Sequence, residues 1–391
     1  MMFGCIFCTQ KFVVMQKLAI IGASYLQKPL VEKAKEMGLY TLCFAWEDGA
    51  VCKDLVDEFY PISITEKEQI LKICQKEQID GICTIASDTA APTVAYVAEK
   101  MGLVGNSYEC ACTANNKYLM RQAFMKANVP CPQYMMVDEQ NINHCQLSTV
   151  NYPLIVKPSD RSGSLGVTKV ENKEDLQSAI EKAINCSFKK QAMVEEFVDG
   201  REISVEFISY NGKHYPLTIT DKVTTESPHF VELEHHQPAD FCKEMYANIY
   251  GVTEQALNAL GVTNGASHSE YKITKDGQIK IMEIGARMGG DFIGSNLVQL
   301  STGYDFLKGV IDVALGQFTA PQKTLDKHSG VYFLCKETEY LQPIFSTAVN
   351  IPEIVQYEQT DSELRYVERS ADRSGYLIYQ ANKKWIPNNK N

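Results

Sequence analysis

An Asp-Gly dipeptide at positions 276 and 277 separates two runs of β-prone residues, and it constrains the fold more than any other feature of the chain. Asp-Gly between such runs is the strongest short-range signal for a β-hairpin with a two-residue loop. A two-residue loop fixes the cross-strand partners of both strands. The expected pairs are Lys275 with Gln278, Thr274 with Ile279, Tyr271 with Met282, and Glu270 with Glu283.

The last of these pairs brings two carboxylates together. Directly paired residues point to the same face of a sheet, with Cβ atoms ~4.5–5.5 Å apart, so Glu270 and Glu283 repel unless a cation lies between them. In phosphoryl-transfer sites Mg²⁺ is typically held by one or two carboxylates together with substrate phosphates. The pair therefore predicts a Mg-nucleotide site. The alternative is a solvated hairpin with two surface acids, and a bulge or longer loop would separate the acids onto opposite faces.

An arginine and two glycines follow the second acid. Arg287 has the same strand parity as Glu283 and reaches the same face if the strand continues. A guanidinium there would offer forked donors to phosphate oxygens, and Gly289 and Gly290 would permit close backbone approach. In isolation, Arg-x-Gly-Gly is typical of a turn.

A second phosphate signal lies upstream, between residues 152 and 170. An apolar run ends in Lys157, and a Ser/Gly-rich loop containing Gly163 and Gly166 follows it. Such a loop offers backbone N–H groups and hydroxyls to phosphate oxygens. The spacing is not that of a Walker motif. A flexible hairpin is the alternative.

A third segment, residues 192–206, is an apolar stretch interrupted by acids. A short apolar linker can bury an adenine ring and present backbone groups to its edge, while acids just beyond it accept ribose hydroxyls. Two strands with exposed acids would produce the same pattern.

Taken in this order, the three segments resemble the ATP-grasp superfamily over roughly residues 16–380, and ATP-dependent carboxylate–amine ligases in particular, including L-amino acid ligases. Carbamoyl-phosphate synthase and biotin carboxylase modules are related. The resemblance implies nucleotide lysines at Lys117 and Lys157, a lid loop at Ser162, Gly163, Ser164 and Gly166, an adenine hinge at Glu195, Glu196, Phe197 and Val198, a ribose acid at Glu202, metal acids at Glu270 and Glu283, and a phosphate arginine at Arg287.

The resemblance extends to a few further positions. Lys222 lies where related ligases place a phosphate-contacting lysine, and Glu232 and His236 match a stretch near the triphosphate. A His beside another His, as His236 is, is more often a loop residue than a ligand, and His268, which shares the parity of Glu270, could equally be a structural histidine. Many relatives have Asn where this chain has Gly285, which leaves open whether one metal ion or two are bound.

Composition is that of an ordinary globular protein, with 45% hydrophobic and 22% charged residues among 391. The net charge of −10 disfavours nucleic-acid or anionic-membrane partners. Thirteen scattered cysteines suggest reduced thiols in the cytoplasm. No run approaches the ~20 apolar residues that span a bilayer.

The predicted fold class is mixed α/β and α+β. Alternating strand and helix patterns from Leu18 to Met101 predict a doubly wound parallel sheet with helices on both faces. Ser87 and Asp88 follow a strand end that faces the expected cleft, so one could touch substrate and one could cap a helix. The predicted organisation is an extension at 1–14 before Met15, the α/β domain at 15–112, a linker helix and lid at 113–200, a central antiparallel metal-bearing sheet at 201–325 and a strand-rich C-terminal subdomain at 326–391.

The expected reaction is phosphoryl transfer from ATP to a small-molecule carboxylate, followed by attack of an amine on the acyl phosphate. Mg²⁺ is the expected metal and Mn²⁺ a substitute, with Arg287 and Lys222 acting on the transferring group. A biotin carboxylase-like enzyme that phosphorylates bicarbonate, and a non-catalytic nucleotide-binding module, are the alternatives. A homodimer is compatible with the sequence.

Overall fold

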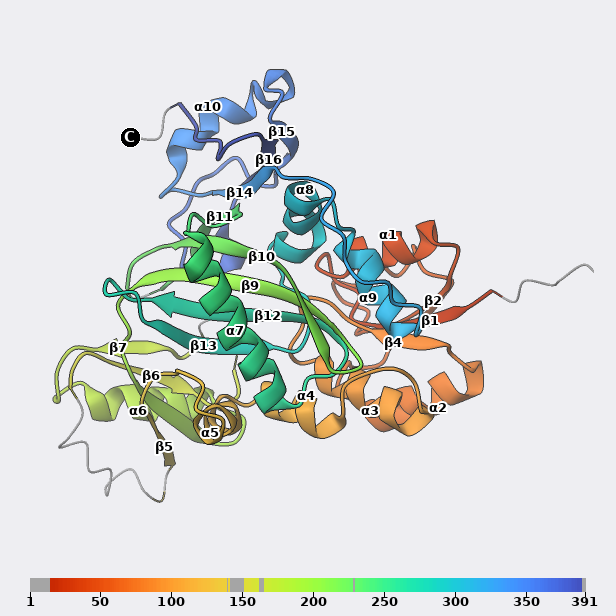
Figure 1. The fold of residues 1–391 in the computed structure, drawn as a ribbon, viewed down its shortest axis with the longest axis horizontal. Coiled ribbons are helices and arrows are strands. Elements are labelled where there is room, and N and C mark those ends of the chain that lie inside the picture. Colours follow the sequence, from red (N-terminus) through yellow and green to blue (C-terminus); the bar gives the residue numbers. More distant parts are fainter. Residues whose placement is uncertain (1–14, 139, 141–150, 162–164, 228, 389–391) are drawn as a thin grey trace, which may run out of the picture.

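The structure is a computed structural model, which describes residues 15–138, 140, 151–161, 165–227 and 229–388. The expected extension at 1–14 and the lid-loop residues Ser162, Gly163 and Ser164 lie outside the described residues. Figure 1 shows a parallel sheet with its helices on one side of the molecule, a large antiparallel sheet in the middle, and a smaller lid sheet below it.

The first domain is a parallel sheet covered by helices on both faces, as predicted. The strands run in the order β3-β2-β1-β4. One face packs on α1 and, from far along the chain, on α9, whereas the other packs on α2 and α3. The elements are β1 (Lys17–Ile21), α1 (Lys28–Glu36), β2 (Tyr40–Phe44), β3 (Glu58–Tyr60), α2 (Lys67–Glu77), β4 (Gly81–Cys83), α3 (Ala91–Met101) and α9 (Phe306–Ala314).

Two short helices lead into the lid. The lid is an antiparallel sheet of order β5-β8-β6-β7. Apolar residues of α6, among them Ile180 and Ile184, cover one face of this sheet. The elements are α4 (Tyr108–Ala114), α5 (Lys117–Lys126), β5 (Tyr134–Asp138), β6 (Leu154–Pro158), β7 (Thr168–Val170), α6 (Leu176–Cys186) and β8 (Gln191–Glu196).

The central sheet has eight strands in the order β13-β12-β9-β10-β11-β14-β16-β15. Its last three strands come from the C-terminal segment, so that segment continues the central sheet. The elements are β9 (Arg201–Tyr210), β10 (Lys213–Thr224), β11 (Glu232–Gln237), α7 (Lys243–Leu260), β12 (Gly265–Ile273), β13 (Ile279–Gly285), α8 (Val298–Thr302), β14 (His328–Leu334), α10 (Gln342–Phe345), β15 (Ile354–Gln359) and β16 (Gly375–Ala381).

Side chains of β9 and β12 point alternately into the hydrophobic core and toward a pocket on the opposite face of the sheet. Val205 of β9 and Tyr271 of β12 pack beneath α7 in an apolar cluster. Their even-numbered neighbours point to the opposite face, where Glu202 and Glu270 line a pocket. Side chains alternate between the two faces of a strand, so one pair of strands supplies both the core and the charged surface.

The β12–β13 hairpin pairs Glu270 with Glu283 as predicted, but the turn and the register near the turn differ from the prediction. The turn is one residue longer than expected, so Ile273 and not Thr274 pairs with Ile279, and Tyr271 pairs with Ile281. A bulge beyond Tyr271 then adds one residue to β13 and restores the register. The expected pairs closer to the turn are therefore wrong. The carboxylate pair is right because the longer turn and the bulge cancel.

Candidate functional site

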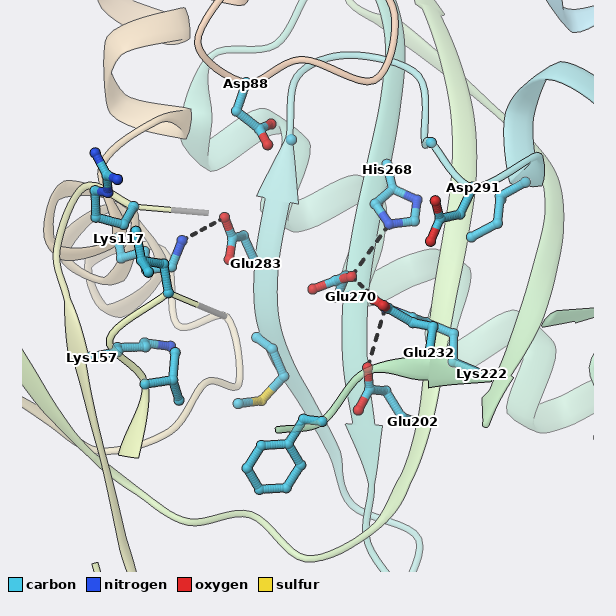
Figure 2. Close-up of a pocket in the computed structure, with 18 of the residues that line it drawn as sticks. Asp88, Lys117, Lys157, Glu202, Lys222, Glu232, His268, Glu270, Glu283 and Asp291 are labelled. Carbon is cyan, nitrogen blue, oxygen red and sulfur yellow. Dashed lines mark hydrogen bonds and ion pairs between the residues drawn. The ribbon is translucent and has the colours of Figure 1, made fainter. Parts of the chain in front are cut away.

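A pocket of about 400 Å³ lies between the lid, the central sheet and the loop after β4. Its lining residues include many that the sequence singled out: Lys117, Lys157, Phe197, Val198, Glu202, Lys222, Glu270, Glu283 and Arg287. Figure 2 shows Lys117 and Lys157 on one side of the cavity, the two paired acids in its floor, and Lys222 with Glu202 and Glu232 on the other side. The fold thus gathers residues that lie far apart in the sequence, on the linker helix, the lid and the central sheet.

Each of the paired acids is held by its own lysine. Lys117 Nζ, at the start of α5, lies 2.7 Å from Glu283 Oε1, and Lys222 Nζ of β10 lies 2.6 Å from Glu270 Oε1. Burial alone would raise the pKa of Glu270, but Lys222 and His268 outweigh it and hold the pKa well below its ordinary value. Both ammonium groups neutralise the carboxylate repulsion that the pairing creates.

Lys222 is shared among three acids. Besides Glu270, it lies 3.2 Å from Glu202 and 3.5 Å from Glu232. Burial would lower the pKa of Lys222, but these carboxylates raise it well above its ordinary value. The lysine is therefore a fixed positive charge facing the pocket floor.

Arg287 forms an ion pair with Asp88, an acid of the first domain. Its Nε and Nη2 atoms each donate to the Asp88 carboxylate at 2.8 Å, in a forked arrangement. Gly285 makes room for this pair, because a Cβ there would lie 2.9 Å from Asp88 Oδ1 and 3.0 Å from Arg287 Cζ. A side chain at position 285, such as the Asn of many relatives, would therefore collide with the Asp88–Arg287 ion pair. The expected helix cap is not found at either residue, because the N-cap of α3 is Ala90 and no side chain caps it; the Ser87 hydroxyl accepts from Ala90 N at 3.3 Å in the turn before the helix.

His268 is also drawn into the charged network. Its Nδ1 atom lies 2.5 Å from Glu206 and its Nε2 atom 3.5 Å from Glu270. Burial would lower the pKa of His268, but Glu206 and Glu270 raise it to about 9. Gly289 permits this packing, because a Cβ there would lie 2.7 Å from His268 Nδ1.

Two of the expected adenine-hinge residues do not line the pocket. Phe197 and Val198 are in its wall, whereas Glu195 is 1% exposed and points behind it. The side chain of Glu196 turns outward and accepts from Gln133 N at 3.2 Å. Gly166 also lies off the pocket, in a positive-φ turn packed against α6 and Pro158. Strand β8 ends at Glu196, so alternation turns Glu195 and Glu196 to opposite sides of the lid sheet, and the two residues that line the cavity lie beyond the strand.

Glu195 instead anchors a buried charge cluster. Arg121 Nε of α5 lies 2.7 Å from Glu195 Oε1, and Lys157 Nζ lies 2.5 Å from Glu195 Oε2. Arg121 also donates to the Met282 carbonyl at 2.7 Å, beside Glu283. Burial alone would raise the pKa of Glu195, but Arg121 and Lys157 hold it below its ordinary value. One arginine therefore ties the linker helix, the lid and the acid-bearing hairpin together.

The Arg121→Met variant is expected to lower the free energy of unfolding by about 3–5 kcal/mol, the range for removing one partner of a buried pair. The physical reason is that the buried Glu195 loses its closest guanidinium. Chemical denaturation checks this, with Arg369→Met as the control. Arg369 is 76% exposed and pairs with Asp372 on the surface, so its loss should change stability by no more than ~1 kcal/mol. Equal effects of both substitutions would contradict the assignment.

The expectation for His236 is wrong. This ring is buried away from the pocket, where Nε2 lies 2.9 Å from Glu234 Oε2 and Nδ1 lies 3.0 Å from the Tyr379 hydroxyl. The register of β11 against β10 shifts between Glu232 and Glu234, which leaves Leu233 as an extra residue. This bulge inverts the parity, so Glu232 is joined in the pocket by His235.

His235 is the functional candidate that the sequence reasoning missed. The residue is 1% exposed, and neither ring nitrogen has a hydrogen-bond partner among the residues that the structure describes. Burial lowers the pKa of His235 well below its ordinary value, and Lys222, Arg373, His236 and His268 add to the effect. The two adjacent histidines indicated that one imidazole could face the pocket. The bulge at Leu233 determines that this ring is His235 and not His236.

A neutral buried histidine makes stability depend on pH in a known direction. The unfolded chain takes up a proton near pH 6.5 and the folded chain does not, so wild-type stability should fall as the pH drops below that value. The His235→Gln variant should lose about 1.4 kcal/mol less per pH unit in this window. Urea denaturation at a series of pH values checks this. Parallel curves for the two proteins between pH 6.5 and 4.5 would show that His235 titrates normally.

The fold and the site together define an α/β protein whose charged cleft lies between a lid sheet and a larger antiparallel sheet. Among the described residues, no helix is both long and apolar enough to cross a bilayer. Solved structures share this architecture over nearly the whole chain. The L-amino acid ligase from Bacillus licheniformis superimposes with a TM-score of 0.77 over 94% of each chain, at 22% identity. A purK N5-carboxyaminoimidazole ribonucleotide synthetase, solved with ADP, gives 0.77 over 95% and 94% at 17% identity.

Residues 150–295 match the model of the ATP-grasp domain. Among curated proteins, alanine–anticapsin ligase of Bacillus subtilis strain 168 is 29% identical over 268 residues, which is 63% of this chain and 56% of that protein. Human carnosine synthase 1 is 23% identical over 85% of this chain and 44% of its own. This chain thus spans about half the length of these curated relatives. Part of this chain, residues 150–295, is thus similar to ATP-grasp domains, and the whole chain shares its fold with the solved structures above.

Proposed function

We propose that the protein is an ATP-dependent carboxylate–amine ligase. In this reaction the γ-phosphoryl group of ATP passes to a small-molecule carboxylate, and an amine displaces phosphate from the acyl phosphate to form an amide. The observation that carries the proposal is the pairing of Glu270 with Glu283 in the floor of a pocket that also presents Lys117, Lys222 and Arg287.

The donor set suits Mg²⁺ bound together with phosphates. Among the residues that the structure describes, no three His, Cys, Asp or Glu side chains are grouped to hold a metal ion by themselves. Two facing carboxylates would therefore hold the ion only when nucleotide oxygens complete its shell, which is how Mg²⁺ is usually bound. When bound, Mg²⁺ supplies positive charge that offsets the phosphate oxygens. Gly285 offers no side-chain oxygen, so Glu270 and Glu283 are the proposed ligands.

The chain's own cations would hold the remaining oxygens. Lys117 and Lys157 lie on the linker-helix and lid side, and their ammonium groups would bind the nucleotide phosphates. Both lysines are now paired with acids, so nucleotide binding would replace carboxylate partners by phosphate partners. Lys222 and Arg287 would face the transferring group, with Asp88 holding the guanidinium in a fixed orientation. Catalysis of this type consists mostly of positioning and electrostatic stabilisation.

Closure of the lid would protect the intermediate. An acyl phosphate reacts with water, so the site must exclude solvent until the amine attacks. Phe197 and Val198 at the base of the lid would cover the adenine, and Glu202 would accept the ribose hydroxyls. The names of the relatives support ligation of amino acids or similar acids, since they include an L-amino acid ligase and an alanine–anticapsin ligase.

A phosphate-release screen tests the proposal. ATP, Mg²⁺ and pools of amino acids and small carboxylates are supplied with and without an amine, and full-rate ADP formation should require both an acid and an amine. Turnover that depends on bicarbonate and free biotin would support a carboxylase instead. Tight ATP binding with no turnover in any pool would indicate a nucleotide-binding module.

A further inference from the structure

A second cleft opens beside α7, away from the pocket described above. It has a volume of about 840 Å³, and within the described part of the chain it shares no lining residue with that pocket. Its walls come from β9, β10, the loop between β11 and α7, α7 itself, and the segments before β14 and after β16. Figure 1 shows α7 lying across the central sheet. We call this hollow the α7 cleft, and its lining includes Arg201, Tyr246, Tyr250, Lys323, Lys327 and Lys383.

The lining of the α7 cleft reverses the charge balance of the chain. The whole sequence has 48 acidic residues against 38 lysines and arginines. Among the described residues, the cleft is lined by five lysine or arginine side chains and only two aspartates. One of these aspartates, Asp221, is already paired with Arg201, whose Nε and Nη2 atoms donate to it at 2.6 and 2.5 Å. The surplus of positive charge therefore belongs to the lysines.

The lysines come from two segments that are distant in the sequence. Lys323 and Lys327 precede β14. Lys383 and Lys384 follow β16. Lys383 is exposed and has no ion-pair partner in the ranges that the structure describes, and the partner of Lys323 is Asp326, which is itself 89% exposed. Because like charges gathered in this way repel one another, a bound anion would stabilise the arrangement.

Arg201 gives an independent indication of a ligand, because its guanidinium is held in a fixed orientation. Its Nη1 atom donates to the Asp240 carbonyl at 2.8 Å, and the guanidinium lies 4.1 Å from the centre of the Phe241 ring. The side chain nevertheless remains 38% exposed, whereas that of Asp221 is 12% exposed. A planar guanidinium matches the geometry of phosphate and carboxylate groups. A donor that is already oriented for an anion thus lines the cleft.

The shape of the cleft favours a small molecule over a macromolecule. Sites for small molecules are typically hollows of ~300–1,000 Å³ with apolar and aromatic walls. The α7 cleft is of this size, and Phe241, Tyr246 and Tyr250 are in its wall. The net charge of −10 would repel a long polyanion such as a nucleic acid where it extends beyond the cleft.

The cleft lies behind two strands that carry residues of the first pocket. Alternation along β9 and β10 places Arg201 and Asp221 on the face that packs under α7. The next residue on each strand, Glu202 and Lys222, lines the pocket on the opposite face, as Figure 2 shows. Because the sheet separates the two cavities, a ligand of the cleft is not a substrate of the reaction in the pocket. An anion that binds Arg201 would compete with Asp221 and so disturb both strands.

We propose that the α7 cleft is an effector site for a small molecule that carries two or more phosphate or carboxylate groups. The lysines bind the anionic groups, Arg201 adds a forked contact, and the aromatic wall packs against the rest of the molecule. Through the Arg201–Asp221 pair the effector alters the affinity of the pocket for nucleotide, and the nucleotide alters the affinity for the effector by the same factor. The site does not depend on which reaction the pocket carries out.

Calorimetry on the full chain tests the site, with the pocket filled by Mg²⁺ and a non-hydrolysable ATP analogue. The probes are inorganic pyrophosphate and tricarballylate, and the tighter of the two identifies the anionic group. At least one probe should bind as one molecule per chain. The double variant Lys323→Gln, Lys383→Gln should weaken that binding by about tenfold or more, because it removes two charge-assisted contacts. The matched control Lys72→Gln, Lys76→Gln removes the same charge from exposed positions on α2 and should leave binding unchanged.

The affinity for the ATP analogue is measured separately, with and without the probe. It should change by about fivefold or more, and the Lys323→Gln, Lys383→Gln protein should lose this change while keeping its affinity for the analogue alone. No binding of either probe, or equal binding by the two double variants, would overturn the site. A change that the cleft variant retains would place the probe in the nucleotide pocket and would overturn the site as well. Binding in the cleft that leaves the affinity for the analogue unaltered would overturn the effector role.

Discussion

Replacing Glu270 or Glu283 with glutamine is expected to reduce ATP turnover by at least ~100-fold, the lower end of the cost of losing one electrostatic group at a reacting centre. Glutamine keeps the size of the side chain but removes the charge that would hold Mg²⁺ against the phosphates. Each variant also leaves a lysine without its nearest carboxylate, since Lys222 pairs with Glu270 and Lys117 with Glu283. Steady-state phosphate release, once an acid and an amine are known, measures the loss.

The same hairpin provides the control. Asp276 lies in its exposed turn, where it bonds only to Thr274 and Gln278 among the described residues, so Asp276→Asn should retain wild-type turnover. Circular dichroism should show that the two glutamate variants remain folded. Near-normal activity of a folded Glu270→Gln protein would refute the two-acid assignment.

Arg287→Ala is expected to bind ATP nearly normally yet turn over at least ~100-fold more slowly. The guanidinium faces the place where charge develops during transfer, so its contribution belongs to the transition state more than to the bound nucleotide. ATP affinity by calorimetry, measured beside the maximal rate of phosphate release, separates the two effects. Reduced affinity at an unchanged maximal rate would place Arg287 in ground-state binding.

Asp88→Asn is the matched variant for this arginine. It retains the guanidinium and weakens only the forked carboxylate that holds it, so the loss of rate should be smaller than in Arg287→Ala. A loss as large as that of Arg287→Ala would show that the orientation of the guanidinium, as much as its presence, determines the rate.

The sequence predicted the carboxylate pair for a reason that was only partly correct. Asp-Gly located the turn and the alternation located the strands, but the turn length and the bulge both departed from the simple register. Had only one of these departures occurred, Glu270 and Glu283 would have pointed to opposite faces. In β11 a single bulge was not compensated, and the predicted His236 gave way to His235. Bulges depend on packing against neighbouring strands, which local sequence does not reveal.

Ion pairs between residues that are distant in the sequence could not be predicted from the sequence for a similar reason. Asp88 and Arg287 are 199 residues apart, and nothing in either segment indicates the other. The parallel sheet of the first domain, by contrast, follows from local periodicity, because each strand and helix there carries its own apolar pattern. The roles assigned to the pocket residues, and the proposed boundaries of the domains, remain predictions.

The continuity of the central sheet limits how the chain can be divided. A fragment of residues 150–295, the region that matches the ATP-grasp domain, would end before β14 and leave β11 as an unpaired edge. Exposed edge strands invite pairing with other chains, so such a fragment is expected to aggregate. It would also lack Lys117, Asp88 and Arg373, which reach the pocket or its wall from outside that region. Stable folding and a complete pocket therefore require the longer chain. The fragment that matches the ATP-grasp domain is expected to have neither.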